Sequence, residues 1–461
     1  MVTLFRHHFH LTTLLQAIFE ACLFFGLVYF CVHVLPHGSL NPAPSPVLPA
    51  LVFAVAMLGV STAFGLYRHD QPLGVTAVAP RFLISLLIAL PIAYAVFTVY
   101  PQAYPVNDAI TAGALVGLVG VLAARKAMVP GLQAGFAPHR ALVVGTGAAA
   151  AAVERALRES PLAGVQIVGF FPVQLPESTL VPESRIVRRF ASVADAAREL
   201  RVDEVIVAVR EQRGGVMPMD DLLSCRLSGV PVTHLVGFME RVKGVVPLES
   251  LKASWLIYGD GFRQGRVRTF IKRAFDVVVS ATLLVLAAPV MLLAAIAVML
   301  ESPGPIVFRQ QRVGRAGATF DVLKFRSMRM DAEGDGTPRW AAANDTRVTW
   351  VGRLLRRTRI DELPQLINVL TGEMSFVGPR PERPYFVAQL GESIPFYALR
   401  LGVKPGITGW AQVRHEYTAS VEDSAKKLEY DLYYVKNHSL FLDLMILLET
   451  VRVVLFGEGA R

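Results

Sequence analysis

Residues 356–365 read Arg-Arg-Thr-Arg-Ile-Asp-Glu-Leu-Pro-Gln, so an adjacent acidic pair follows three arginines and opens a short apolar run. An Asp before such a run is typical of a helix N-cap, Glu is favoured in the first turn, and Pro364 is tolerated there. At the positive end of a helix, Asp361 and Glu362 are expected to stay ionised. Nearby cations can hold a phosphorylated substrate against them. The stretch alone predicts either a capped helix or a site for phosphate chemistry.

The composition indicates a membrane protein. The chain has 461 residues, of which 53% are hydrophobic and only 18% charged, whereas soluble proteins carry about a quarter of charged residues. This length predicts two or three domains. The net charge of +9 suits an anionic lipid surface or anionic substrates, and no nucleic-acid-binding module is recognisable. The three cysteines predict neither a disulfide framework nor a metal framework.

Four apolar segments in residues 1–134 predict a four-helix transmembrane bundle, at residues 11–35, 47–67, 82–100 and 109–124. Basic residues lie before the first segment, between the second and third, and after the fourth, namely Arg6, Arg68, Arg81, Arg125, Lys126 and Arg140. Since cytoplasmic loops carry the excess of Lys and Arg, the N-terminus and everything after residue 130 are expected in the cytoplasm. Glu20, midway along the first segment, is either a helix-packing contact or a functional group.

Residues 135–255 are expected to form a Rossmann-like domain with a parallel sheet. The predicted strands are 141–144, 165–170, 205–209 and 230–235, and helices are predicted to about residue 159, near 193–200 and at 220–227. Gly145 and Gly147 resemble a dinucleotide-binding loop, but Ala150 stands at the third glycine position and no acidic residue ends the second strand. A structural or regulatory role is therefore favoured over nucleotide binding.

A fifth apolar segment, residues 277–300, is predicted to enter the membrane and return. Pro289 lies in its middle and should break or bend a helix. Basic residues flank it on both sides, namely Arg266, Arg268, Lys272, Arg273, Arg309, Arg312 and Arg315. Both ends are thus expected in the cytoplasm, as a helix–break–helix hairpin at residues 265–302 that enters one leaflet. A complete fifth span is the alternative.

Residues 303–461 are expected to form a small α+β catalytic domain. Lys324 and Arg326 alternate with Phe325 and can project from one strand face, which is either a phosphate site, a solvated face or a lipid-surface patch. The stiff loop Gly-Pro-Arg-Pro-Glu-Arg-Pro at 378–384 carries Arg380 and Arg383, in a form that suits bidentate phosphate recognition. No common hydrolase, metalloprotease or P-loop motif is present, so carboxylates and cations are left to carry the chemistry.

Longer runs of this region resemble the bacterial sugar transferase family, the monotopic polyprenyl-phosphate phosphoglycosyl transferases. These runs are Lys324-Phe-Arg-Ser-Met, Ile360-Asp-Glu-Leu-Pro-Gln-Leu-Ile-Asn-Val-Leu-Thr-Gly-Glu-Met-Ser, Val377-Gly-Pro-Arg-Pro, Lys404-Pro-Gly-Ile-Thr-Gly-Trp-Ala-Gln-Val and Asp431-Leu-Tyr-Tyr-Val-Lys-Asn. The catalytic resemblance covers about residues 267–461. The domain order resembles the large form that starts exopolysaccharide or O-antigen units, and Ser254-Trp-Leu-Ile-Tyr-Gly-Asp-Gly-Phe-Arg resembles its exosortase-associated, EpsB-like branch.

The resemblance implies that Asp361 attacks the sugar-bearing phosphate of a UDP-sugar, releases UMP, and passes the sugar phosphate to undecaprenyl phosphate. Glu362 would assist, either by ordering Mg²⁺ together with Asp361 or by handling a proton. The candidates for binding substrate phosphates are Lys324, Arg326, Arg356, Arg380, Arg383 and Arg414. Arg414 is the least secure of them, because many members read Val-Asn-Gly-Arg-Asn where this chain has Val413-Arg-His-Glu-Tyr. Asp431 and Asp443 occupy second-tier acidic positions.

The resemblance further implies a multi-pass protein of the bacterial inner membrane, with membrane lipid, a second copy of the chain as a homodimer, and downstream glycosyltransferases as partners. Two alternatives stand beside it, a membrane-tethered nucleotide-sugar oxidoreductase that uses the Rossmann-like domain and a non-catalytic scaffold. The absent third glycine weighs against the first, and the intact Asp361–Glu362 pair weighs against the second. Neither the sugar nor the polysaccharide can be named from the sequence.

Overall fold

The computed structural model describes residues 2–4, 7–9, 11–34, 47–67, 75–99, 111–123, 138–160, 164–173, 178–209, 217–251, 261–262, 265–330, 332, 345–415 and 420–456. Most of the loops that orient the predicted spans, with Arg6, Arg68, Arg125 and Lys126, lie outside these ranges, as does most of residues 254–263. The chain divides into two compact units, one largely before and one largely after residue 244.

The first unit contains four apolar helices where the sequence predicts four apolar segments. They are α1 (Leu11–Val34), α2 (Val47–Ala63), α3 (Val75–Val99) and a helix at Thr111–Ala123, and the short strands β1 (Val2–Leu4) and β2 (His7–Phe9) precede them. Side chains of all four helices share one buried cluster, which includes Phe24, Phe53, Phe82 and Ala114. Among the described residues, only Thr13–Cys31 of α1 and Arg266–Glu301 are long and apolar enough to cross a membrane.

Glu20 is a packing contact within these helices. Its side chain is buried and accepts hydrogen bonds from Gln16 Nε2 at 3.0 Å and from the Tyr67 hydroxyl at 2.7 Å. Tyr67 follows α2, so the pair ties the end of that helix to α1. Because a buried carboxylate requires such partners, this geometry favours the helix-packing interpretation of Glu20 over a functional one.

The same unit contains the predicted parallel sheet, with strand order β4-β3-β5-β6. Its elements are β3 (His139–Val144), α5 (Ala148–Glu159), β4 (Val165–Phe171), α6 (Val193–Glu199), β5 (Glu204–Val207), α7 (Met219–Leu227), β6 (Val232–His234) and α8 (Leu235–Lys243), with a short 3-10 turn at Glu183–Arg185. A second 3-10 turn, Leu248–Ser250, belongs to the other unit. The buried strands Ala141–Val144 and Glu204–Val207 form the centre of the sheet, as expected for strands covered on both faces. The α/β part of the predicted fold class is therefore confirmed.

The second unit is built on α10 (Arg266–Glu301) and two small sheets. Its other elements are β7 (Val307–Val313), a 3-10 turn at Arg315–Gly317, β8 (Thr319–Phe325), α11 (Trp350–Arg357), η5 (Ile360–Glu362), α12 (Gln365–Thr371), β9 (Ser375–Val377), α13 (Pro384–Ser393), η6 (Tyr397–Gly402), β10 (Gly406–Thr408), α14 (Trp410–Arg414), α15 (Val421–Asn437) and α16 (Leu440–Phe456). Strands β7 and β8 form an antiparallel hairpin, whereas β9 and β10 pair in parallel.

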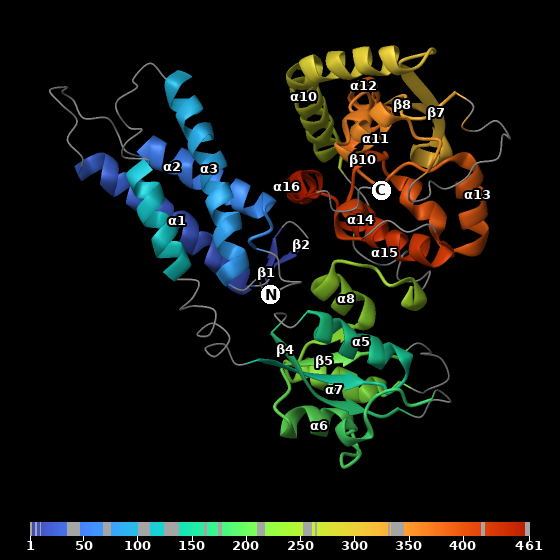
Figure 1. Cartoon of the computed structure of the whole chain (residues 1–461). Helices are drawn as coiled ribbons and strands as arrows, with labels where there is room; N and C mark the ends of the chain where they lie inside the picture. Colours follow the sequence, from blue (N-terminus) through green and yellow to red (C-terminus); the bar gives the residue numbers. More distant parts are fainter. Residues whose placement is uncertain are drawn as a thin grey trace. The chain divides into compact units, whose positions relative to one another are not determined.

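Helix α10 is continuous through Pro289, so the predicted break is a bend within one helix. Figure 1 shows two arms that meet at an angle, as a proline inside a helix explains by removing one backbone hydrogen bond. The arm before the bend buries Asp276 and Ser280, and the arm after it buries Ala294 and Val298. The last two pack with side chains of β8 and α11. Much of the remaining apolar surface of α10 is exposed.

Candidate active site

The chain turns sharply just before the acidic pair. Helix α11 ends at Arg357, and Arg359 adopts a left-handed conformation, with φ 59°, that residues other than glycine rarely adopt. Asp361 and Glu362 then lie in the single 3-10 turn η5, and α12 begins only at Gln365, after Pro364. The N-cap prediction for Asp361 is therefore wrong. The N-cap of α12 is Pro364, whose side chain has no polar atom to accept a capping hydrogen bond. The acidic pair forms a separate turn before it.

Glu362 accepts two charged hydrogen bonds in a buried position. Lys324 Nζ lies 3.2 Å and Arg380 Nη2 lies 3.0 Å from the same oxygen, Oε1. Asp361 is also buried, with 7% of its surface exposed, yet its Oδ1 has no hydrogen-bond partner. Since an unpaired buried carboxylate oxygen is costly, Asp361 is the part of the site that can gain most from an incoming group.

The two carboxyl groups have pKa values pushed apart by these surroundings. Burial, and then the charge of Glu362, raise the pKa of Asp361 above its ordinary value. Burial acts in the same direction on Glu362, but the charges of Arg380 and Lys324 outweigh it and hold the pKa of Glu362 well below its usual range. The sequence predicted that both groups ionise easily at the positive end of a helix; the raised pKa of Asp361 opposes this prediction, because η5 precedes the start of α12 and buries that side chain.

Lys324 and Arg356 supply positive charge to this carboxylate pair. Burial lowers the pKa of Lys324 below the ordinary lysine value, and the charge of Glu362 opposes that change. Arg356 donates from Nε to Ser327 Oγ at 2.9 Å, and the negative charge of Asp361 acts on its guanidinium. The structure therefore gathers Lys324, Arg356 and Arg380 around Asp361 and Glu362, although β8, α11 and the loop after β9 contribute them separately.

The loop that carries Arg380 is held by Arg400, which the sequence analysis did not single out. Arg400 Nη2 donates to the carbonyl oxygen of Arg380 at 2.9 Å, and its Nε donates to Asp431 at 2.9 Å. Arg400 also donates to the Tyr397 hydroxyl. Asp431 is thus placed at Arg400. The signal that could have found Arg400 is a single cation within the run Tyr397–Gly402, which is a weak one.

The structure places four other predicted residues in contacts elsewhere in the second unit. Arg326 binds the end of α10, where it donates to the Val298 and Ser302 carbonyls. Arg414 pairs with Glu449 at 2.7 Å. Asp443 pairs with Lys272 of α10 at 3.0 Å, and Arg383 stands at the N-cap of α13. Lys324 and Arg326 were expected on one strand face, but Arg326 follows the end of β8 and turns toward α10.

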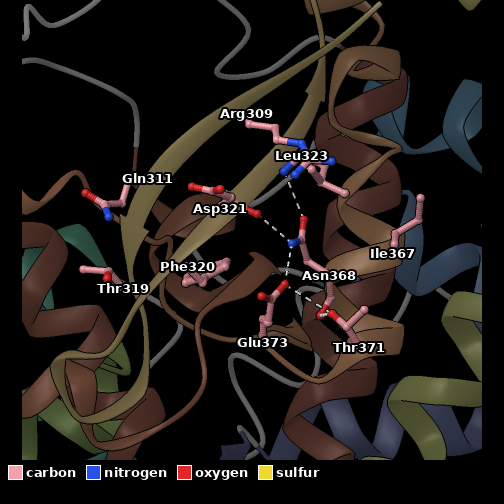
Figure 2. A pocket seen from close by; sticks show the side chains of 10 residues that line it. All are labelled: Arg309, Gln311, Thr319, Phe320, Asp321, Leu323, Ile367, Asn368, Thr371 and Glu373. Atoms are coloured by element: carbon pink, nitrogen blue, oxygen red, sulfur yellow. Dashed lines mark hydrogen bonds between the residues drawn. The ribbon is translucent and has the colours of Figure 1, made fainter.

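A separate pocket of about 420 Å³ lies on the other face of the β7–β8 hairpin (Figure 2). Leu323 lines it, whereas Lys324, the next residue of the strand, reaches Glu362 on the opposite face. Asn368 of α12 extends the strand pairing there. Its Oδ1 accepts from the Leu323 amide at 3.0 Å, and its Nδ2 donates to the Asp321 carbonyl at 2.8 Å. Asn368 thereby fixes α12 to the free edge of β8.

The buried, partly unpaired carboxylate among fixed cations defines a site suited to chemistry on a phosphate group. Comparison with known proteins matches residues 267–457 to the family described as bacterial sugar transferase. A relative from Xanthomonas campestris pv. campestris, a UDP-glucose:undecaprenyl-phosphate glucose-1-phosphate transferase, is 32% identical over 406 residues, which cover 81% of each chain. The chain therefore belongs to the bacterial sugar transferase family.

Two further relatives match a shorter part of this chain at higher identity. A UDP-N-acetylgalactosamine-undecaprenyl-phosphate N-acetylgalactosaminephosphotransferase from Aeromonas hydrophila is 42% identical over 262 residues, covering 57% of this chain and 61% of the relative. A UDP-glucose:undecaprenyl-phosphate glucose-1-phosphate transferase from Escherichia coli (strain K12) is 48% identical over 187 residues, covering 40% of each chain. The chain thus spans less than two thirds of the length of these two relatives.

Proposed function

We propose that this chain transfers a sugar-1-phosphate from a UDP-sugar to undecaprenyl phosphate through a covalent aspartyl-phosphosugar. The observation that carries the proposal is the Oδ1 atom of Asp361, which is buried without a hydrogen-bond partner beside a glutamate held by two cations. The activities by which the three relatives are named are of this type. The product would be undecaprenyl-diphosphate-sugar, the first membrane-bound intermediate of exopolysaccharide or O-antigen assembly.

The reaction has two displacement steps at one phosphorus atom. In the first, an Asp361 oxygen bonds to the sugar-bearing phosphorus, the bond from that phosphorus to the bridging oxygen breaks, and UMP leaves with that electron pair. In the second, a phosphate oxygen of undecaprenyl phosphate bonds to the same phosphorus, and the Asp361 carboxylate leaves unchanged. Splitting one transfer into two in this way is ordinary covalent catalysis, and it consumes no net proton.

The cations of the site would stabilise the charge that builds up on the transferred group. Arg380 and Lys324 already point at Glu362 Oε1, so a phosphate oxygen near Asp361 would lie within their field without rearrangement of the chain. Arg356, fixed to Ser327, would add a third positive charge. Fixed donors of this kind favour the transition state because they need no reorganisation when the reaction occurs.

The residues present also fit Mg²⁺. This ion takes one or two carboxylates and completes its octahedron with water and substrate phosphate oxygens, and Asp361 Oδ1 is a buried carboxylate oxygen without another partner. Asp361 and Glu362 would hold it. When bound, Mg²⁺ would neutralise diphosphate charge and help UMP to leave. No group of three or more metal-binding side chains occurs in the described part of the chain, which fits an ion held largely by substrate.

We also propose that α10 enters the membrane from the cytoplasmic side and returns, and that residues 1–134 form a bundle of four spans. The support is that both arms of α10 contact the same catalytic fold. Arg273 of the first arm donates to carbonyls of α12, and the end of the second arm is held by Arg326. An exposed apolar middle with both ends on one domain fits insertion into one leaflet. The catalytic residues would then lie at headgroup level, where a lipid phosphate and a cytosolic nucleotide-sugar meet.

The experiment measures UMP release by the solubilised full-length chain. Protein is incubated with Mg²⁺, undecaprenyl phosphate and a panel of UDP-sugars, including UDP-glucose and UDP-N-acetylgalactosamine. Release by the wild type but not by Asp361→Asn is expected, with the sugar attached to lipid in the wild type only. The proposal would be overturned if no UDP-sugar gave UMP with protein whose thermal unfolding transition shows that it is folded. The panel also identifies the sugar.

A second experiment tests the membrane arrangement. A single cysteine at Ser302, after α10, is placed in a background without Cys22, Cys31 and Cys225 and treated in whole cells with a membrane-impermeant thiol reagent. Re-entry predicts no labelling until the cells are opened. Labelling from outside would mean that α10 spans the membrane, and a cysteine in a periplasmic loop of the predicted bundle serves as the positive control.

A further inference from the structure

One helical turn of α10 contacts both halves of the candidate active site. Arg273 donates from both terminal nitrogens to the Val369 and Leu370 carbonyls at the end of α12. Three residues later, Asp276 accepts from the Phe376 amide at 3.2 Å and from Ser375 Oγ at 2.8 Å, both in β9. Positions three apart in a helix lie on the same face, so a single turn of α10 contacts α12 through Arg273 and β9 through Asp276.

The two elements held by this turn carry opposite sides of the site. Helix α12 begins three residues after Glu362, so its position sets that of the acidic pair. Strand β9 ends at Val377, and Arg380 follows three residues later. The distance between Arg380 and Glu362 Oε1, 3.0 Å, therefore depends on how α12 and β9 are spaced.

The path from β9 to Arg380 leaves little room for adjustment. A Cβ on Gly378 would lie 2.4 Å from the Lys404 carbonyl oxygen, and a Cβ on Gly409 would lie 2.2 Å from the Gly378 carbonyl oxygen. The Gly378 amide donates to the Thr408 carbonyl at 2.8 Å. A shift of β9 is thus passed on to Arg380 instead of being absorbed by the loop.

The turn is itself fixed by a buried ion triad. Lys272 lies 2.7 Å from Asp276 Oδ1 and 3.0 Å from Asp443 Oδ2 of α16. Asp276 and Asp443 are 3% and 1% exposed. Asp443 also accepts from the Tyr434 hydroxyl at 2.7 Å. Lys272 is the cation that the two buried carboxylates share, so its removal would leave two buried carboxylates uncompensated, and the group holds α10 against α16.

We infer that Arg273 and Asp276 are positioning residues, which set the spacing between the acidic pair and Arg380 and so couple the seating of the membrane-entering helix to catalysis. The inference rests on the proposed function. It assigns these two residues no contact with substrate. An α10 that is not seated against α12 and β9 would leave Arg380 away from Glu362, and the enzyme would be inactive until its membrane helix is in place.

The first test is a double-mutant cycle on UMP release by the full-length chain in lipid nanodiscs. Asp276→Asn is expected to lower kcat about 10-fold to 100-fold, as a displacement of about 1 Å at a reacting group can do, with little change in the KM for undecaprenyl phosphate. In an Arg380→Ala background, the same change should alter kcat by less than about 2-fold. Effects that multiply instead would mean that Asp276 acts elsewhere, and would overturn the inference.

Matched variants guard against a folding artefact. Arg273→Gln should behave as Asp276→Asn does, whereas Arg268→Gln removes the same charge from an exposed position of the same helix and should leave kcat unchanged. Ser375→Ala removes one hydrogen bond of Asp276 without altering any charge, and should give a smaller loss in the same direction. Equal losses in Arg268→Gln and Arg273→Gln would contradict the inference.

A readout independent of activity separates this inference from the proposed function. Spin labels at the exposed positions Ile367 of α12 and Tyr385 of α13, in a cysteine-free chain, report the distance between α12 and the segment that follows β9 and Arg380. The distance distribution should broaden in Asp276→Asn and Arg273→Gln but not in Arg268→Gln. Broadening in a chain that releases no UMP with any UDP-sugar would retain the positioning role and reject the transferase. Unchanged distances together with an unchanged kcat would reject the positioning role and retain the transferase.

Discussion

Two buried glutamates of this chain each accept hydrogen bonds from an arginine, yet their surroundings differ. Glu204, at the start of β5 in the parallel sheet, receives Arg241 at both oxygens, at 2.8 and 2.7 Å, together with the Thr233 hydroxyl at 2.6 Å. Glu362 receives Lys324 and Arg380 at one oxygen, and its neighbour Asp361 has an oxygen with no partner. The first cluster is saturated, whereas the second can still bind a charged group.

The number of hydrogen bonds still available to a ligand separates a structural ion pair from a reactive one. Burial and pairing are common to both glutamates, so neither property identifies a site. What distinguishes η5 from the Glu204 cluster is Asp361 Oδ1, a carboxylate oxygen without a hydrogen-bond partner within the field of fixed cations, so part of the hydrogen-bonding capacity is left for a ligand. The variants below alter the two clusters in turn, beginning with the largest expected effect.

Replacement of Asp361 should have the largest effect. Asp361→Asn replaces the proposed nucleophilic carboxylate by a neutral amide of the same size, and UMP release should fall at least about 10³-fold, as for other covalent nucleophiles. The thermal unfolding temperature should not fall, because an unpaired buried carboxylate is lost. UMP release at a tenth of the wild-type rate would exclude Asp361 as the nucleophile.

Replacement of Arg380 should have the next largest effect. Arg380→Ala removes one of the two donors to Glu362 and one charge that would face the transferred phosphate, so kcat should fall about 10²-fold. Arg380→Lys should recover little, because an ammonium cannot reproduce the two-pronged geometry of a guanidinium. A matched control is Arg383→Ala, three residues along the same loop, and an equal loss there would contradict a specific role for Arg380.

The pH dependence of UMP release should be narrower than that of ordinary Asp and Lys residues. Activity requires ionised Asp361, whose pKa is raised, so activity should fall with decreasing pH earlier than an ordinary carboxyl group would cause. It also requires protonated Lys324, whose pKa is lowered, so the alkaline decline should begin below about pH 10.4, the ordinary lysine value. The measurement is kcat/KM against pH, and Lys324→Arg should extend only the alkaline limb. An unchanged alkaline limb in that variant would mean that deprotonation of Lys324 does not cause the loss of activity at high pH.

Disruption of the saturated cluster should have the smallest effect on the reaction. Glu204→Gln leaves Arg241 of α8, whose side chain is 23% exposed, without its charged partner and should destabilise that unit by about 2 kcal/mol. Amide hydrogen exchange in β3 and β5 should accelerate, whereas kcat for UMP release by the intact chain should change less than about 2-fold. A loss of UMP release comparable with that of Arg380→Ala would mean that the two clusters are coupled.

The elements of the fold could be predicted well because their signals are local. Buried strands between glycines and amphipathic helices predicted the sheet, with ends within a few residues of those observed. Strand β6, predicted at residues 230–235, lies at Val232–His234, because α8 begins at the next residue. Long apolar runs likewise predicted the four helices of residues 11–123 and the bend at Pro289, since both follow from single-residue properties.

The candidate site could be predicted only in part, because its remaining features depend on chain segments that meet in space. The N-cap prediction failed since nothing in the sequence around Arg359 announces a left-handed residue. Strand alternation put Arg326 beside Lys324, but the end of α10, which precedes it by about 24 residues, offers carbonyls that bind it instead. Arg400 and Asp431 lie far from the acidic pair in sequence, and only the tertiary structure relates them to Arg380.

The packing at Gly378, Gly406 and Gly409 has a consequence for how this family can vary. At each of these positions, an added Cβ would come within 2.4 Å of backbone atoms of the others or of Lys404. The three glycines have no side chain that takes part in the reaction. Even alanine at any of them would push β9 and β10 apart, so we expect every substitution there to reduce function. In a library of all single variants selected for polysaccharide production, these three glycines should be as intolerant as Asp361 itself. A search for chemical groups alone would overlook them, since their contribution is the absence of an atom.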